Sequence, residues 1–111
     1  MSHDDLTEQA FWSLASEFIE RANSACEAQD PALVNAALLE AAARFTAFSV
    51  AAASLDRKAF IEDLDDSLAF WSSRYRQRLE EHLQDYREHY KNHIGTPADD
   101  SASSEPDSIT R

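Results

Sequence analysis

The sequence predicts an all-α protein: an antiparallel three-helix arrangement with a long third helix and a disordered acidic C-terminal tail. Three observations predict this class. Large apolar residues recur every three or four positions, which is the period of a helix with one apolar face. The 111 residues include a single glycine, whereas a sheet protein needs many tight turns of the kind that glycine serves best. Breaks in the apolar pattern near residues 30 and 54 divide the chain into three segments.

The first predicted helix spans about residues 6–29 and follows a disordered stretch at residues 1–5. Acidic residues at its start suit the positive end of a helix dipole and can cap it. The apolar residues step by four and three, so they form one face that should point to the core. This face comprises Phe11, Ala15, Phe18, Ala22 and Ala25, and it is widened by Trp12, Ile19 and Cys26.

The second predicted helix spans residues 31–53 and has the clearest start in the chain. Asp30 is a good N-cap, and Pro31 suits the first helical turn because its missing N–H loses no hydrogen bond there. The segment is apolar or small on nearly all sides. We therefore expect it to be the buried central element.

The third predicted helix runs from about residue 57 to residue 93, with Ser54 or Asp56 as its cap. It is longer than the other two and would overhang them unless it bends. Gly95 and Pro97 end it, which closes a helical domain at residues 6–95. Residues 96–111 are rich in Ser, Asp, Pro and Ala, so we expect a disordered acidic tail.

The composition excludes several classes of protein. A formal charge of −11 opposes binding to nucleic acid and to anionic membranes, because both carry negative phosphates. The N-terminus lacks the basic and apolar regions of a secretory signal. Residues 33–53 are apolar, but Glu40 and Arg44 would be costly in a bilayer. Since Cys26 is the single cysteine, a reducing, cytoplasmic location is the natural interpretation.

Two polar groups are candidate sites, each with an ordinary alternative. His82, Asp85, His89 and His93 are weak metal-site candidates, because they lie roughly along one face of the third helix. The alternative is a set of solvated positions, and we expect no metal or cofactor. Glu40 and Arg44 form either a solvent-facing ion pair or a buried polar pair. The buried pair would meet Asn23 or Glu20 of the first helix and would fix the helix register or mark a pocket.

The third helix carries separate charge blocks, which suggest a homodimer. The acidic block is Glu62, Asp63, Asp65 and Asp66, and the basic block is Arg74, Arg76 and Arg78. An antiparallel homodimer centred on residues 68–71 would set each acidic block against the partner's arginines. The aromatic residues that fit this interface are Phe70, Trp71, Tyr75, Tyr86 and Tyr90. The alternatives are two solvated patches and ordinary core aromatics.

The chain resembles a family of short, uncharacterised proteobacterial proteins, a domain of unknown function. The resemblance rests on Phe-Ile-x-x-Ala-Asn at residues 18–23 and on Ala-Leu-Leu-x-Ala-Ala-Ala-Arg-Phe-x-Ala-Phe at residues 37–48. A tyrosine-containing third helix follows, and the similarity covers about residues 11–90. It implies a bacterial cytoplasmic helical protein and brings no activity with it.

No motif for nucleophilic catalysis or phosphate binding occurs in the sequence. We therefore expect a non-enzymatic, cytoplasmic protein-interaction or adaptor module with an unknown protein partner. The alternative is a helical protein that binds a small ligand or a metal, and an enzyme is the least favoured class.

Overall fold

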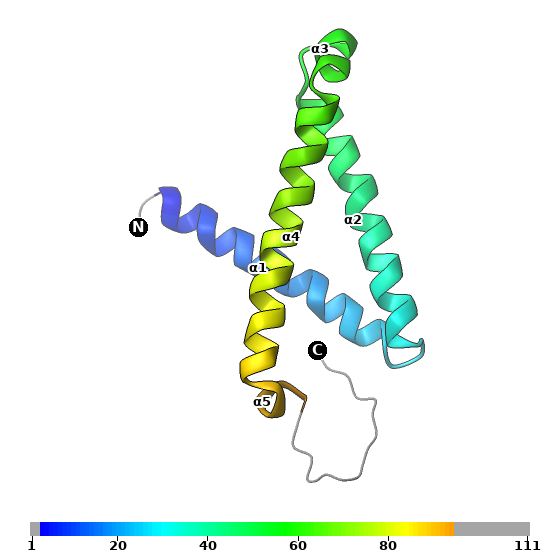
Figure 1. Cartoon of the computed structure of the whole chain (residues 1–111), viewed down its shortest axis with the longest axis vertical. Coiled ribbons are helices and arrows are strands. Elements are labelled where there is room, and N and C mark those ends of the chain that lie inside the picture. Colours follow the sequence, from blue (N-terminus) through cyan, green and yellow to red (C-terminus); the bar gives the residue numbers. More distant parts are fainter. Residues whose placement is uncertain (1–2, 95–111) are drawn as a thin grey trace. The chain divides into compact units, whose positions relative to one another are not determined.

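The computed structural model describes residues 3–94, which are almost entirely helical (Figure 1). No strand occurs in this range and 89% of it is helix, so the predicted all-α class is confirmed. The predictions for residues 1–2 and 95–111, including the acidic tail, lie outside the described residues. The helices are α1 (His3–Ala25), α2 (Pro31–Ala53), α3 (Arg57–Glu62), α4 (Leu64–Glu88) and α5 (Tyr90–Ile94).

The chain divides into two units within α2. The first unit contains α1 and the start of α2 as far as Glu40, and the second unit begins at Ala41 and contains the rest of α2 with α3, α4 and α5. Within the second unit, α4 contacts both α3 and α5. The predicted antiparallel packing of three helices stays a prediction.

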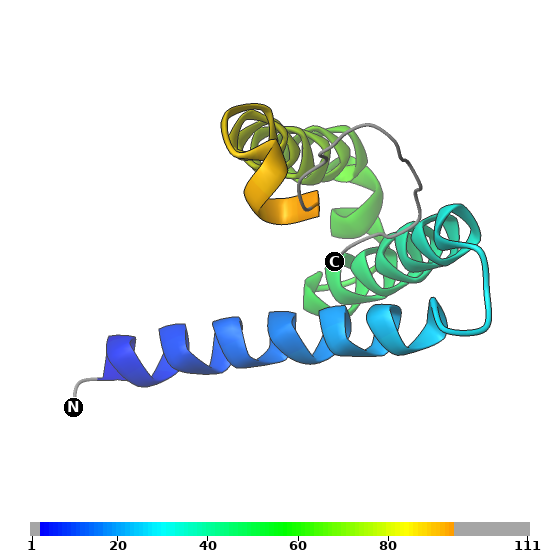
Figure 2. The same cartoon turned by 90° about the horizontal axis from the view of Figure 1, so that it is seen from below.

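The bounds of α1 correct the prediction at both ends. The helix begins at His3 rather than residue 6, because Asp4 and Asp5 lie inside its first turn, where carboxylates interact favourably with the helix dipole. Figure 2 shows α1 as one unbroken helix. It ends at Ala25 rather than residue 29, since the backbone tightens: the Glu27 N–H donates to the Ser24 carbonyl at 3.1 Å.

The bounds of α2 are those predicted, residues 31–53. At its start the Val34 N–H donates to the Asp30 carbonyl at 3.0 Å, and after its end the Ser54 hydroxyl donates to the Val50 carbonyl at 3.0 Å. The expected burial of this helix is wrong for the described residues, because none of its side chains is buried. Phe45 and Phe48 are 68% and 63% exposed. A helix that is apolar on nearly every side needs neighbours on every side to be covered.

The predicted long third helix is broken at two residues and becomes α3, α4 and α5. The Asp56 carboxylate caps α3 as predicted, accepting the Ala59 N–H at 2.9 Å. At Asp63 the backbone leaves the helical region (φ −98°, ψ 7°), and at His89 it does so again (φ −130°, ψ 38°). Figure 1 shows the chain changing direction at both points. The sequence leaves open whether this helix is continuous or bent, and the structure has it broken at these two residues.

In neither unit is any described side chain buried. The apolar faces that the sequence predicts as a core are present on the helices, but they remain largely uncovered among residues 4–94. Exposed apolar faces of this extent are a mark of surfaces that contact another chain or another part of the same chain. This property directs the search for a functional site to helix faces rather than to a cavity.

Candidate functional site

One candidate contact surface is a row of apolar side chains on α4, which we call the α4 stripe. Its members lie three or four residues apart and therefore share one face of the helix. Each of them is at least 41% exposed, and the Phe70 ring lies edge-to-face against Trp71, with 5.0 Å between the ring centroids. The α4 stripe is defined by Leu64, Leu68, Trp71, Tyr75 and Leu79. It contains Trp71 and Tyr75, two of the five aromatic residues that the sequence suggests for an interface.

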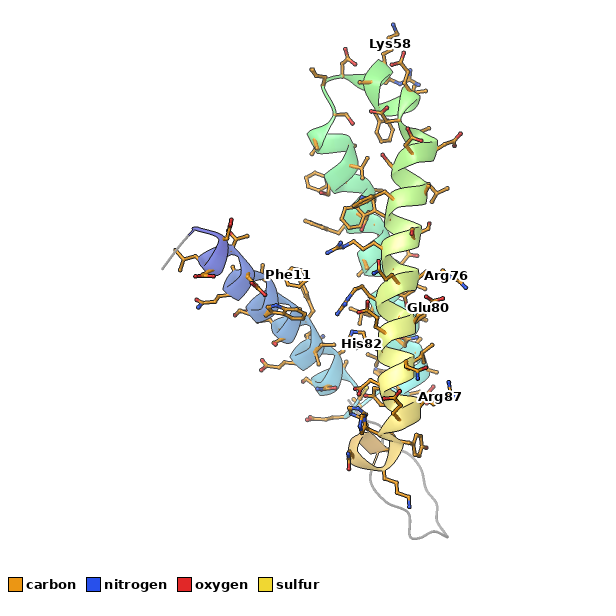
Figure 3. The ribbon with its side chains drawn as sticks, turned by 60° about the vertical axis from the view of Figure 1, so that its left-hand side comes forward. Phe11, Lys58, Arg76, Glu80, His82 and Arg87 are labelled. Atoms are coloured by element: carbon orange, nitrogen blue, oxygen red, sulfur yellow. The ribbon has the colours of Figure 1, made fainter. Side chains whose placement is uncertain are left out.

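Charged side chains flank the α4 stripe. Arg76 lies 3.1 Å from Glu80, and these side chains are 78% and 60% exposed, so the pair contributes little to stability. Arg76, Glu80 and Arg87 project from one side of α4, and His82 projects from another (Figure 3). Within residues 3–94, Asp65 and Arg74 form no ion pair. These charges on α4 remain open to an external partner.

A polar cluster lies where α4 meets α5. Asp85 Oδ1 is 3.1 Å from His89 Nδ1, and Asp85 Oδ2 is 2.8 Å from His93 Nε2. The Tyr86 ring stacks on His93, with 4.1 Å between centroids. Hydrogen bonds from His89 and then from His93 hold the pKa of Asp85 below its ordinary value of 3.8. The cluster joins the two helices across the break at His89.

The same cluster brings three of the four metal-site candidates together, namely Asp85, His89 and His93. His82 lies outside it and is exposed. Among the described residues, no three His, Cys, Asp or Glu side chains are placed where they could hold a metal ion. Both oxygens of Asp85 already accept hydrogen bonds from the imidazoles, so the cluster has a structural role in holding α5.

The polar pair predicted on α2 lies at the surface. Glu40 and Arg44 are both exposed, which fits the solvent-facing interpretation better than the buried pair. Asn23 lies near the end of α1 and is half-buried. Cys26 is also half-buried and has a free thiol. These residues therefore offer no enclosed pocket within either unit.

A comparison with protein families matches residues 11–87 to the family described as "Protein of unknown function (DUF3144)". The chain belongs to the DUF3144 family. This confirms the resemblance to an uncharacterised family, and the matched range is close to the expected residues 11–90. Searches of curated proteins and of solved structures found no match.

The DUF3144 region includes some of the features above and leaves out others. It contains the whole α4 stripe and both charge blocks, and it ends before His89 and His93. The matched range therefore includes the candidate contact surface and excludes the two histidines of the polar cluster.

Two features of this DUF3144 protein were missed by the sequence reasoning. The stacking of Tyr86 on His93 depends on the break at His89, and an uninterrupted helix pattern gives no signal for it. A shallow depression on α1 is lined by Asp5, Glu8, Gln9 and Trp12. Because one helix face alone lines it, it encloses no ligand.

Proposed function

We propose that this DUF3144 protein is a bacterial, cytoplasmic, non-enzymatic protein-interaction module of the adaptor kind. One observation carries the proposal: apolar helix faces are uncovered in a region where no described side chain is buried. Apolar faces of this kind are stabilised when another polypeptide removes them from water. The function is therefore association, with the helices as the contact surface.

The charge and the single thiol support this assignment. With 21 acidic and 10 basic residues, the chain favours a partner with an apolar or basic surface over nucleic acid or an anionic membrane. A single free cysteine fits a reducing compartment. By length and composition alone α2 could cross a membrane, but it carries Glu40 and Arg44. A charged pair at mid-helix fits a protein contact better than a lipid contact.

A metal-binding or ligand-binding role has less support. It rests on the Asp85 cluster, whose polar atoms are already hydrogen-bonded to one another. Asp85 and His89 are exposed where α4 ends rather than gathered in a concave pocket, which is where small-molecule sites usually lie.

The experiment is affinity capture of the tagged chain at native expression level, followed by reassembly from purified components. We expect a stoichiometric protein partner, which can be a second copy carrying a different tag. The Leu68→Asp variant should weaken binding about tenfold or more, because it places a charge in the apolar contact. Gln77→Asp introduces the same side chain on the opposite side of α4 and should leave binding unchanged.

A chain that captures no partner and sediments as a monomer would contradict the proposed function. Equal unfolding midpoints for wild type, Leu68→Asp and Gln77→Asp would contradict it further, because they would indicate that the Leu68 side chain contacts nothing.

A further inference from the structure

We propose that the α4 stripe is covered by the α4 helix of a second copy of this chain, in antiparallel orientation, with its two-fold axis between Ala69 and Phe70. The inference rests on the proposed association function and deepens it by naming the partner and the register. It uses only α4 and the residue before it, all of which lie in one unit of the chain.

The apolar residues are symmetric about this axis. In an antiparallel pair centred between residues 69 and 70, Leu68 lies level with the partner's Trp71. In the same way, Leu64 lies level with the partner's Tyr75. Each aromatic ring of the α4 stripe therefore meets an aliphatic side chain, a combination that fills a helix interface without leaving gaps. The sequence alone places these four residues symmetrically.

The charges follow the same symmetry on both edges of the stripe. At about 100° per residue, Asp65 and Arg76 lie on one edge of the stripe and Arg74 on the other. The N-cap residue Asp63 extends this second edge by one position, since its carbonyl accepts the Ser67 N–H at 2.8 Å in the first turn of α4. Members of each pair are eleven residues apart, about three turns, and so project in nearly the same direction. The two-fold axis lies in the interface plane, so each edge of one α4 helix meets the same edge of the other. Asp65 therefore faces the partner's Arg76 and Asp63 faces the partner's Arg74, with about 3 Å between their positions along the helix.

The other helices of the chain do not offer this complementarity. α1 and α2 contain one arginine each and no lysine, so neither can face both aspartates with a basic residue. Asp65 and Arg74 form no ion pair within the described residues, and Asp63 makes no side-chain capping bond. In a parallel pair opposite edges of the stripe would meet, and aspartate would then face aspartate and arginine would face arginine.

The contact is short, which sets the expected affinity. The overlap of the two α4 helices spans residues 64–75, about 18 Å, so we expect a dissociation constant of about micromolar or weaker. The test is therefore sedimentation from about 1 to about 300 µM protein in about 0.15 M salt.

Three charge variants test the orientation. The acid-reversed variant is Asp63→Arg with Asp65→Arg, the base-reversed variant is Arg74→Glu with Arg76→Glu, and the exchanged variant carries all four substitutions. Each reversed variant should dimerise about tenfold or more weakly than wild type, because both edges become repulsive. An equimolar mixture of the two reversed variants should form a heterodimer. The exchanged variant should dimerise as wild type does and should not pair with wild type.

Matched controls separate the interface from helix stability. Asp66→Arg makes the same change as Asp65→Arg in the same first turn of α4, but on the face away from the stripe. Arg87→Glu makes the same change as Arg74→Glu at about 26 Å from the axis. Both controls should dimerise as wild type does. Recovery in the exchanged variant excludes misfolding as the cause of a loss, and circular dichroism reports the helix content of every variant.

The outcomes distinguish this inference from the proposed function. Preferential pairing of the exchanged variant with wild type would indicate a parallel dimer and overturn the inference. Self-association unaffected by any reversal would show that a second copy does not cover the α4 stripe in this register. A chain that stays monomeric at the highest concentration, yet captures a different protein, would refute this inference and leave the proposed function standing.

Discussion

At the residue scale, the best-defined interactions are those of Asp85. This carboxylate accepts hydrogen bonds from His89, four residues along, and from His93, eight residues along. The first contact is a local one on the helix surface. The second spans the break at His89, so it holds α5 against α4, and the Tyr86 ring adds a stacking contact from the same turn.

The lowered pKa of Asp85 predicts an acid-sensitive attachment of α5. Since the folded-state pKa lies below the ordinary value of 3.8, the ionised carboxylate contributes stability above that value. This contribution is lost as the pH falls through the folded-state pKa. We expect NMR titration of the Asp85 carboxyl carbon to give a pKa below 3.8, and the amides of residues 90–94 to lose protection, relative to their intrinsic exchange rates, at the acid end.

Substitutions identify the cause of this shift. The double variant His89→Ala, His93→Ala should raise the pKa of Asp85 towards 3.8, because it removes both hydrogen bonds. His82→Ala lies on the same helix outside the cluster and should leave the titration unchanged. A wild-type pKa at or above 3.8 would show that the two imidazoles do not bind this carboxylate in solution.

At the scale of elements, the bounds of a helix could be predicted only where the sequence has residues that start or stop a helix. Both ends of α2 were predicted because Asp30-Pro31 starts the helix and Ser54 follows its last residue. The breaks at Asp63 and His89 had no comparable signal, since no glycine or proline lies there and the apolar spacing continues through them. The all-α class could be predicted because it needs only the period of the pattern, whereas a break depends on local backbone hydrogen bonds.

The cap of α3 gives a prediction for one element. α3 has only six residues, too few to be stable as an isolated helix, so its end contacts matter. The Asp56 carboxylate accepts the Ala59 N–H at 2.9 Å, and Asp56→Ala should reduce the free energy of unfolding by about 1 kcal/mol. Asp56→Asn keeps an acceptor oxygen and should retain most of it. Urea denaturation measures both, and equal loss in the two variants would contradict a capping role.

The candidate site was only partly predictable from the sequence. Trp71 and Tyr75 were identified together with the charge blocks, because an interface pattern on one helix needs only the sequence and the helical period. The exposure of Leu68 and of the other stripe residues could not be predicted, since the same spacing describes a buried core face equally well. Which of the two applies depends on what covers the helix, and the pattern on a single helix does not contain that information.

At the scale of the whole molecule, two electrostatic effects oppose each other. A charge of −11 on each copy repels a second copy at long range and slows its approach. The aspartate and arginine edges of α4 attract at contact. At about 0.15 M salt the screening length is about 8 Å, so the long-range repulsion is reduced more than the contact pairs. Association should therefore be weak but specific in orientation.

Association of uncovered helices predicts that stability depends on protein concentration. If a second copy binds only the folded chain, a hundredfold increase in concentration above the dissociation constant stabilises it by up to about 2.7 kcal/mol. For an assembly of this size the thermal midpoint should then rise by about 5–10 °C. The acid-reversed variant should show a much smaller rise, whereas Asp66→Arg should follow wild type. Differential scanning calorimetry from about 3 to about 300 µM measures the shift. A wild-type midpoint that does not change over this range would mean that no second copy of the chain stabilises the folded state.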